Sequence, residues 1–345
     1  MKHALAALVV LSASACLTLD EGAEVETGVV ARAIDPGASG CPVWGCGANS
    51  ATVGDGFVFD ELDQTGVAAN LGGVTIASVN APDGSPGKLY VSGSQMTVWT
   101  YDWRPFYGRS IVNTVIKLRH PTLGFIEVKI TNYDDKALRF WAGPPDAVPF
   151  YELKARNPVT GQFSDPACHS ELTEDPMWVG KPHYAVVFQG DRYDAASKKA
   201  RDVGDSDPWF NIACAGTSPA KMHLMRHTRA SSVAASGASY WTTDKERTAL
   251  LKMFTADYCG NGHTFTVDGQ PLAYQDSAHW KNPMEDYWAI ESYWTNTGAT
   301  CLHKPRYTDL NIIYTVCGRV LPDCPSPTWP TAWEDSAHVF SALRP

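Results

Sequence analysis

Alternating apolar and polar residues run through the first half of the chain. In FIEVKIT (125–131), isoleucine and valine alternate with Glu127 and Lys129, which is the period of two expected for a half-buried strand. The preceding SIVNTVIKLRH is rich in β-branched residues, and the segment 121–124 between the two predicts a hairpin turn. Further strands are predicted at KLYVSG, QMTVWTY, ALRFWAG and FYELKAR. Short strands separated by Gly, Pro and Asp favour an antiparallel sandwich or a partly closed barrel.

The second half mixes helical and strand patterns. Thr243 and Glu246 have the spacing of a capping box, and apolar residues then recur at helical intervals. A helix is therefore predicted over 244–257, just before Cys259, and the glycines that follow let the chain turn. A second helix is predicted around 218–227. The fold class that these patterns predict is mainly β with a smaller α+β portion.

Two more hairpins are predicted towards the C-terminus. HTFTV and QPLAY flank Asp268 and Gly269, a strong signal for a two-residue turn. ESYWT and TCLHKP are predicted strands joined through 296–298, which would bring Cys301 onto the same sheet.

The N-terminus has the features of an export signal. It reads MKHALAALVVLSASAC, a lysine followed by an apolar run too short to span a bilayer and then by small residues. The residues before Cys16 resemble the lipobox of bacterial lipoproteins, in which the cysteine is acylated, although Ala13 stands where that motif prefers leucine. The sequence thus predicts a lipoprotein of the cell envelope, held at the periplasmic or surface face of the outer membrane by its lipid anchor. Ordinary cleavage and secretion is the alternative.

Composition changes along the chain in a way that predicts its organisation. Residues 1–15 are the signal peptide, and 16–40 are acidic and rich in small residues, as expected for a flexible tether. A β-rich region is predicted over 41–155 and an α+β region over 156–345.

The charge balance argues against one class of partner. The chain has 345 residues, with 28 Lys and Arg against 37 Asp and Glu, for a formal net charge of -9. Because nucleic-acid binding depends on neutralising phosphates, an acidic chain with no basic run is a poor candidate for it. No cofactor motif, such as a phosphate-binding glycine loop or a dinucleotide fingerprint, is present.

Nine cysteines are present, and if Cys16 carries the lipid, eight remain. An even number in an exported chain favours disulfides, although about a hundred pairings are open to eight cysteines. The favoured pairs are Cys41 with Cys46, Cys317 with Cys324, Cys168 with Cys214, and Cys259 with Cys301. Cys214 with Cys259 is the main rival. No CxxC pair occurs, so the spacing does not indicate a zinc site.

The stretch ADYCGNGHTFTVDGQPL resembles the ADYC domain family, which is named for the motif at Ala256, Asp257, Tyr258 and Cys259. The resemblance extends to FNIACAG before the motif and WTNTGATC after it, and covers roughly 209–306. It implies a predicted lipoprotein of the kind found in many myxobacteria. The family has no established activity, so the resemblance supplies no catalytic residue.

Three groups of residues invite a chemical interpretation. Cys259 and His263 would form a nucleophile and base only if the cysteine were reduced, and an exported protein favours a disulfide instead. His223 and His227 have zinc spacing on a helix, but the glutamate that a zinc protease needs is replaced by Leu224. DVGDSD (202–207) lacks the calcium-loop spacing and its terminal glutamate, which favours an ordinary acidic loop. No metal site is therefore predicted.

Aromatic residues offer the best candidate contact surface. The cluster consists of Trp280, Tyr287, Trp288, Tyr293 and Trp294. Such rings stack on sugars or anchor a protein partner, and a core rich in aromatics is the alternative.

The sequence thus favours a non-enzymatic structural or binding module with an envelope protein or glycan partner. An envelope hydrolase acting on glycan or peptide is the second hypothesis. A cleft with convergent carboxylates or histidines would favour the enzyme, and an exposed aromatic patch without them the binding module.

Overall fold

The computed structural model describes several stretches of the chain, all within one compact unit, residues 31–345. They are residues 61–136, 138–140, 146–168, 184–201, 208–231, 243–266, 272–276, 289–307, 309–324 and 339–343. The predicted signal peptide, the tether, the pair Cys41 and Cys46 and the acidic loop 202–207 lie outside these residues. Within the described part of the chain, no helix is long and apolar enough to cross a membrane.

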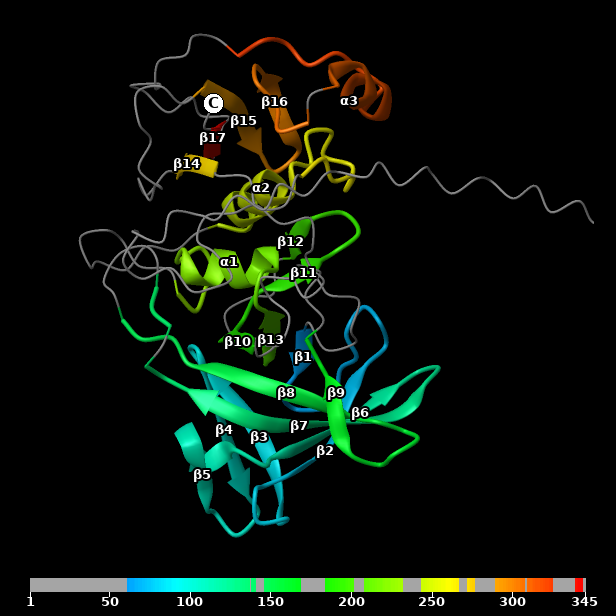
Figure 1. The fold of residues 1–345 in the computed structure, drawn as a ribbon, viewed down its shortest axis with the longest axis vertical. Helices are drawn as coiled ribbons and strands as arrows, with labels where there is room; N and C mark the ends of the chain where they lie inside the picture. The colour runs from blue at the N-terminus through cyan, green and yellow to red at the C-terminus, as the bar shows by residue number, and fades with distance from the viewer. Residues whose placement is uncertain are drawn as a thin grey trace, which may run out of the picture. The chain divides into compact units, whose positions relative to one another are not determined.

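One large antiparallel sheet holds most of the strands, and the mainly β prediction is confirmed. Its strands are β1 (Glu61–Asp63), β2 (Thr75–Asn80), β3 (Pro86–Ser92), β4 (Gln95–Thr100), β5 (Pro105–Tyr107), β6 (Val115–His120), β7 (Gly124–Asp134), β8 (Phe150–Arg156), β9 (Phe163–Pro166), β10 (Tyr184–Gln189) and β13 (Trp209–Cys214). Their order is β1-β13-β10-β8-β7-β6-β2-β3-β4-β5, with β9 paired to β8 (Figure 1).

The large sheet curls around a hydrophobic core. Residues on its inner face alternate with outward residues, and the buried ones include Leu89, Val98, Ile116, Val128 and Leu153. The curl brings the end of β10 to the β3–β4 turn, where Gln189 N donates to Gly93 O at 2.9 Å. The ladder itself does not close into a barrel in the described part of the chain.

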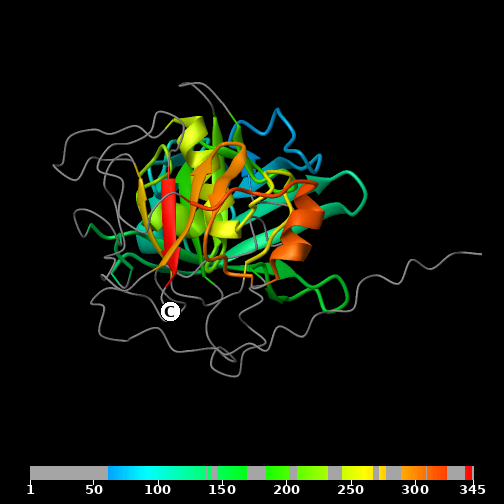
Figure 2. The same cartoon turned by 90° about the horizontal axis from the view of Figure 1, so that it is seen from above.

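Two helices lie between this sheet and a smaller one (Figure 1). Helix α1 (Ser218–Leu224) contacts β10 and β13, and α2 (Asp244–Thr255) contacts strands of the smaller sheet. The smaller sheet has the order β14 (Leu272–Asp276), β17 (Val339–Leu343), β15 (Ala289–Thr295), β16 (Gly298–Leu302). Figure 2 shows it from above, with β17 in red. The remaining elements are the turn η1 (Gly108–Ile111), the hairpin β11 (Arg192–Asp194) with β12 (Lys199–Arg201), and α3 (Leu310–Cys317).

Local signals placed most elements correctly. The capping box at the start of α2 is present, since Glu246 N donates to Thr243 Oγ1 and Thr243 N donates to the Glu246 carboxylate. The β6–β7 and β15–β16 hairpins also form as predicted. Helix α1 is shorter than predicted, because Arg226 adopts a positive φ of 63° just after it.

Two predicted strands are not found where they were expected. Residues 263–266 form no strand, and β14 pairs with β17 instead of with them. ALRFWAG contributes only an isolated bridge between Arg139 and Ala147 among its described residues.

The disulfides confirm one predicted pair and correct two. Cys168 is bonded to Cys214 as predicted. The predicted pairs Cys259 with Cys301 and Cys317 with Cys324 are wrong, because Cys259 is bonded to Cys317 and Cys301 to Cys324. Helix α3 carries Cys317 to the end of α2, while a bond from Leu302 N to Pro322 O of 2.9 Å holds the following segment beside β16.

Candidate functional site

The ADYC motif lies at the turn that follows α2. Ala256 ends the helix in the left-handed conformation, with φ 52°, and its N–H bonds carbonyls of the last helical turn. Gly260 has φ 72°, and a Cβ there would come within 1.8 Å of Thr297 O. The turn therefore packs directly against the β15–β16 turn, and only glycine fits at this point.

Tyr258 of the motif belongs to a buried ionic network. Its hydroxyl donates to Glu291 Oε1 at 2.6 Å and accepts from Arg306 N at 2.9 Å. The Arg306 guanidinium forms a two-point contact with the Glu291 carboxylate, at 2.7 and 3.0 Å. Burial, and then the neighbouring carboxylate, raise the pKa of Tyr258 well above its ordinary value. The tyrosine is therefore a neutral donor that fixes the position of the ion pair.

Asp257 forms a second buried ion pair. Lys252 Nζ lies 2.7 Å from Asp257 Oδ2 and also donates to Ser197 O and Gly260 O, at 3.0 and 3.3 Å. Gly262 N donates to the same carboxylate oxygen at 2.9 Å. Both side chains are fully buried, so the pair ties α2, the motif turn and the β11–β12 hairpin together.

Cys259 completes the motif as a structural residue. Its sulfur is bonded to Cys317, so it has no free thiolate to act as a nucleophile. His263 is exposed and lies against Phe265, with ring centroids 4.6 Å apart. The motif thus supplies a helix cap, an ion pair, a hydrogen-bonded tyrosine and a disulfide.

The predicted aromatic cluster is not an exposed patch where the structure describes it. Trp294 is fully buried, and Tyr293 is 8% exposed. Both belong to β15, an inner strand of the smaller sheet that α2 covers. The other three members, Trp280, Tyr287 and Trp288, lie outside the described residues.

Exposed aromatic rings gather instead at the far end of the large sheet, on β3, β4, β5 and the loop between β4 and β5 (Figure 1). We refer to this group as the aromatic platform. It consists of Tyr90, Trp99, Tyr101, Trp103 and Tyr107, of which Trp103 is 82% exposed. In the strand register, Tyr90 and Tyr107 are both opposite Thr97, which places them on one outward face with Trp99. Fully packed neighbours such as Met96 and Val98 hold these strands from the inner side.

The main-chain edge of β5 beside the platform is occupied. Pro105 has no N–H, and Tyr107 N donates to Ser110 Oγ at 3.0 Å. The same hydroxyl donates to Tyr107 O at 2.7 Å. The rings, and not an open strand edge, are therefore what this end of the sheet presents.

Comparison with known families bears on the rest of the molecule. A family model described as the ADYC domain matches residues 108–308. The chain belongs to the ADYC domain family. No match to a curated protein or to a solved structure was found. The ADYC domain match begins in the large sheet, about a hundred residues before the segment whose sequence resemblance is clearest, and includes both helices α1 and α2. The aromatic platform precedes it in the chain.

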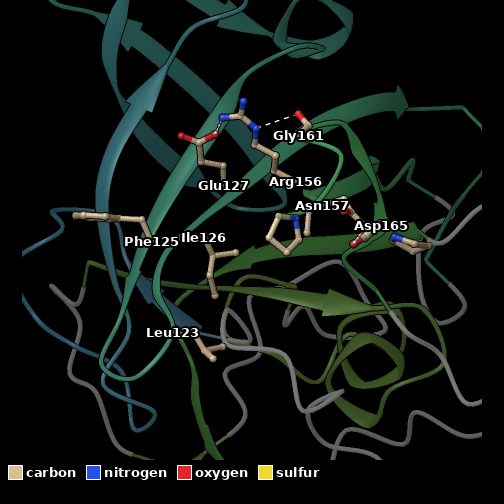
Figure 3. Close-up of a pocket in the computed structure, with 11 residues that line it drawn as sticks. Leu123, Phe125, Ile126, Glu127, Arg156, Asn157, Gly161 and Asp165 are labelled. Carbon is tan, nitrogen blue, oxygen red and sulfur yellow. Dashed lines mark hydrogen bonds and ion pairs between the residues drawn. The ribbon is translucent and has the colours of Figure 1, made fainter.

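The ADYC domain also includes a groove beside the β6–β7 and β8–β9 hairpins (Figure 3). Its volume is about 820 Å³. Arg156 NH1 pairs with Glu127 Oε2 at 2.8 Å, and Asn157 Nδ2 donates to both Asp165 oxygens at 3.1 Å. Leu123 and Phe125 supply exposed apolar surface at its rim.

The two histidines of the ADYC domain with zinc spacing are core residues. His223 lies 2.9 Å from Ser94 Oγ and 2.8 Å from Thr228 Oγ1, and His227 Nε2 lies 2.8 Å from Tyr274 OH. Burial lowers the pKa of each to about 3, so both are neutral at physiological pH. Within the described residues, no cluster of His, Cys, Asp and Glu could hold a metal ion.

Proposed function

We propose that the protein is an exported, lipid-anchored component of the cell envelope that binds a glycan through the aromatic platform. The N-terminal sequence and the three disulfides among the described residues support export to an oxidising compartment. The residues of the motif turn are bonded to one another and to their neighbours inside the fold, so they offer no surface to a ligand.

The observation that carries the proposal is the exposure of several large rings on β3, β4, β5 and the loop between β4 and β5. Large aromatic side chains that stay exposed together mark a contact surface, because burying them in the core would stabilise the fold. The apolar C–H faces of sugar rings pack on such aromatic faces, while their hydroxyls stay hydrated. The occupied edge of β5 disfavours the alternative of a partner's strand added to the sheet.

Glycan binding is tested with the full-length protein on an array of envelope polysaccharides. The double variant Trp99→Leu with Trp103→Leu keeps apolar side chains but removes two rings. We expect each ring to contribute about tenfold in affinity, as for aromatic residues at other binding hot spots. Ile312→Ala is the matched control, since Ile312 is also exposed but lies on α3. Unchanged binding by the double variant would refute the platform as the site.

The lipid anchor has a separate test. Cys16→Ala should release the protein from the membrane fraction or leave its precursor uncleaved. Metabolic labelling with a radioactive fatty acid should mark the wild type and not the variant. Membrane association and processing that do not depend on Cys16 would rule out this anchor.

A further inference from the structure

The outer face of β6, β7 and β8 carries positive charge on an acidic protein. Over 115–120, 124–130 and 152–156, the outward side chains include five cations and two carboxylates, Glu127 and Glu152. The cations, which we refer to as the cationic face, are Lys117, Arg119, Lys129, Lys154 and Arg156. The whole chain has a formal net charge of -9, so this face differs in sign from the average surface.

Within the cationic face, the same arrangement occurs twice. Phe125 has Lys117 Nζ 4.5 Å and Arg119 Cζ 5.7 Å from its ring centroid. Phe163 has Lys129 Nζ 5.4 Å and Arg156 Cζ 6.0 Å from its centroid. Each unit is thus one ring flanked by one lysine and one arginine. The rings belong to β7 and β9, strands that are separated by β8 and so run about 10 Å apart in the sheet.

Two of the cations have no acidic partner in the part of the chain that the structure describes. Glu127 pairs with Arg156 at 2.8 Å and Lys117 at 3.8 Å, and Glu152 pairs with Lys154 at 3.3 Å. Arg119 and Lys129 form no ion pair within the described residues, and each contacts one of the two rings. Each ring unit therefore offers a cation with unused charge beside an aromatic surface.

We infer that the cationic face binds an acidic polysaccharide, whose sugar rings pack on Phe125 and Phe163 while its carboxylates pair with Arg119 and Lys129. This inference rests on the proposed glycan-binding function and names the charge of the glycan. A polymer explains why the unit is repeated, since successive sugars present the same ring and the same acid. The cationic face and the aromatic platform lie on the outward side of the same sheet, separated by β2.

Two other anionic partners fit the observations less well. A membrane surface would meet the carboxylates Glu127 and Glu152 among the cations, and the described hairpin exposes only Leu123 and Phe125 as large apolar side chains. The affinity of a nucleic acid depends on neutralising many phosphates, and the cationic face has only Arg119 and Lys129 without an ion pair in the described structure. Binding to a membrane surface and binding to a nucleic acid are therefore both measured in the test.

The test measures binding of the full-length protein to polygalacturonate and to the neutral galactan made by reducing its carboxyl groups. The variant Arg119→Gln with Lys129→Gln removes the two unused charges and keeps both rings. We expect it to bind polygalacturonate at least tenfold more weakly than the wild type. The wild type should prefer the acidic polymer, and added salt should reduce that preference. The matched control, Lys245→Gln with Lys304→Gln, removes two exposed lysines elsewhere and should bind as the wild type does.

Several results would overturn the inference. They are equal binding of the acidic and neutral polymers, unchanged binding by the charge variant, and binding of phosphatidylglycerol vesicles or single-stranded DNA in place of the polysaccharide. Phe125→Leu adds a test of the ring, because it should weaken binding to both polymers.

The two proposals fail in different ways. If Trp99→Leu with Trp103→Leu has no effect on any glycan while the charge variant loses the acidic one, the platform proposal fails and the cationic face stands. If the tryptophan variant loses all glycans and the charge variant loses none, the cationic face fails alone.

Discussion

The motif turn and the outer face of the large sheet both concentrate charged and aromatic side chains, but they arrange them in opposite ways. At the motif turn, the partners of each buried ion pair lie within hydrogen-bond distance and have almost no contact with water, as in the contacts among Tyr258, Glu291 and Arg306. On the outer face, the rings and cations are partly or fully exposed, and Arg119 and Lys129 have no acidic partner in the described structure.

This difference separates residues that stabilise the fold from residues that are proposed to bind a ligand. The residues that name the family are the ones whose partners are fixed inside the fold, because a buried charge is tolerated only with precise compensation. The residues that we propose to face a ligand are chemically similar, but their proposed partners are outside the molecule. Changes in the first group should therefore alter stability, and changes in the second should alter binding.

The largest effect is expected from breaking the buried ion pair. Arg306→Met leaves Glu291 buried without its partner, which should lower the free energy of unfolding by about 3–5 kcal/mol. Chemical denaturation followed by tryptophan fluorescence measures this change. Adding Glu291→Met to Arg306→Met should recover part of the loss, and a single variant as stable as the wild type would contradict the role of the network.

The disulfide of the motif should rank next. Cys259 and Cys317 are 58 residues apart, and opening a loop of this kind typically costs about 2–4 kcal/mol. Cys259→Ser should lower the melting temperature and leave a free thiol at Cys317. Peptide mapping after thiol labelling identifies the partner, and a label at Cys301 would contradict the pairing described above.

Acid should destabilise the protein through the two buried histidines. Their folded pKa of about 3 lies below the ordinary 6.5, so their contribution to stability is complete above about pH 6.5 and is lost as the pH falls towards 3. At pH 5 the loss is roughly 2 kcal/mol for each histidine. His227→Gln should therefore reduce the difference in unfolding free energy between pH 7 and pH 5 by about that amount.

The smallest effect on stability should come from the platform. Trp103→Leu changes a side chain that is 82% exposed, so the unfolding free energy should stay within about 0.5 kcal/mol of the wild type. Glycan binding should fall in the same variant. A large loss of stability there would mean that the ring packs in the fold and does not face a ligand.

Local patterns predicted the elements better than their partners. The capping box of α2 and the alternation in β7 depend on neighbours in sequence, and both were predicted correctly. The pairing of cysteines depends on where helix α3 returns, which no local signal specifies. Short sequence separation was a poor guide to the disulfide pairs. Cys317 ends helix α3 and is bonded to Cys259, whereas Cys324 lies farther along the chain and is bonded to Cys301 of β16.

The aromatic residues also show a limit of prediction from local sequence, since the sequence does not show which rings the fold buries. The cluster around Trp294 is dense in sequence, but β15 is covered on more than one side, so its rings are buried. The platform is not less dense, since Trp99, Tyr101, Trp103 and Tyr107 all lie in the segment 99–107. The alternation of buried Met96 and Val98 with outward Trp99 was also visible in QMTVWTY. A count of rings cannot separate the two groups, because whether a ring is buried or exposed depends on what covers its strand in the fold. The partners of Tyr258 were equally hidden, since Glu291 is 33 residues away.

The Ser110 hydroxyl has a consequence for how the protein behaves at high concentration. An edge strand with unpaired main-chain groups beside exposed rings is a place where another copy of the protein can add its own strand and begin an aggregate. With Pro105 lacking an N–H and Ser110 holding both main-chain groups of Tyr107, that end offers the next copy little to pair with. If the proposed lipid anchor crowds the protein on a membrane, the occupied edge of β5 should therefore keep neighbouring copies from pairing at this strand while the rings stay exposed.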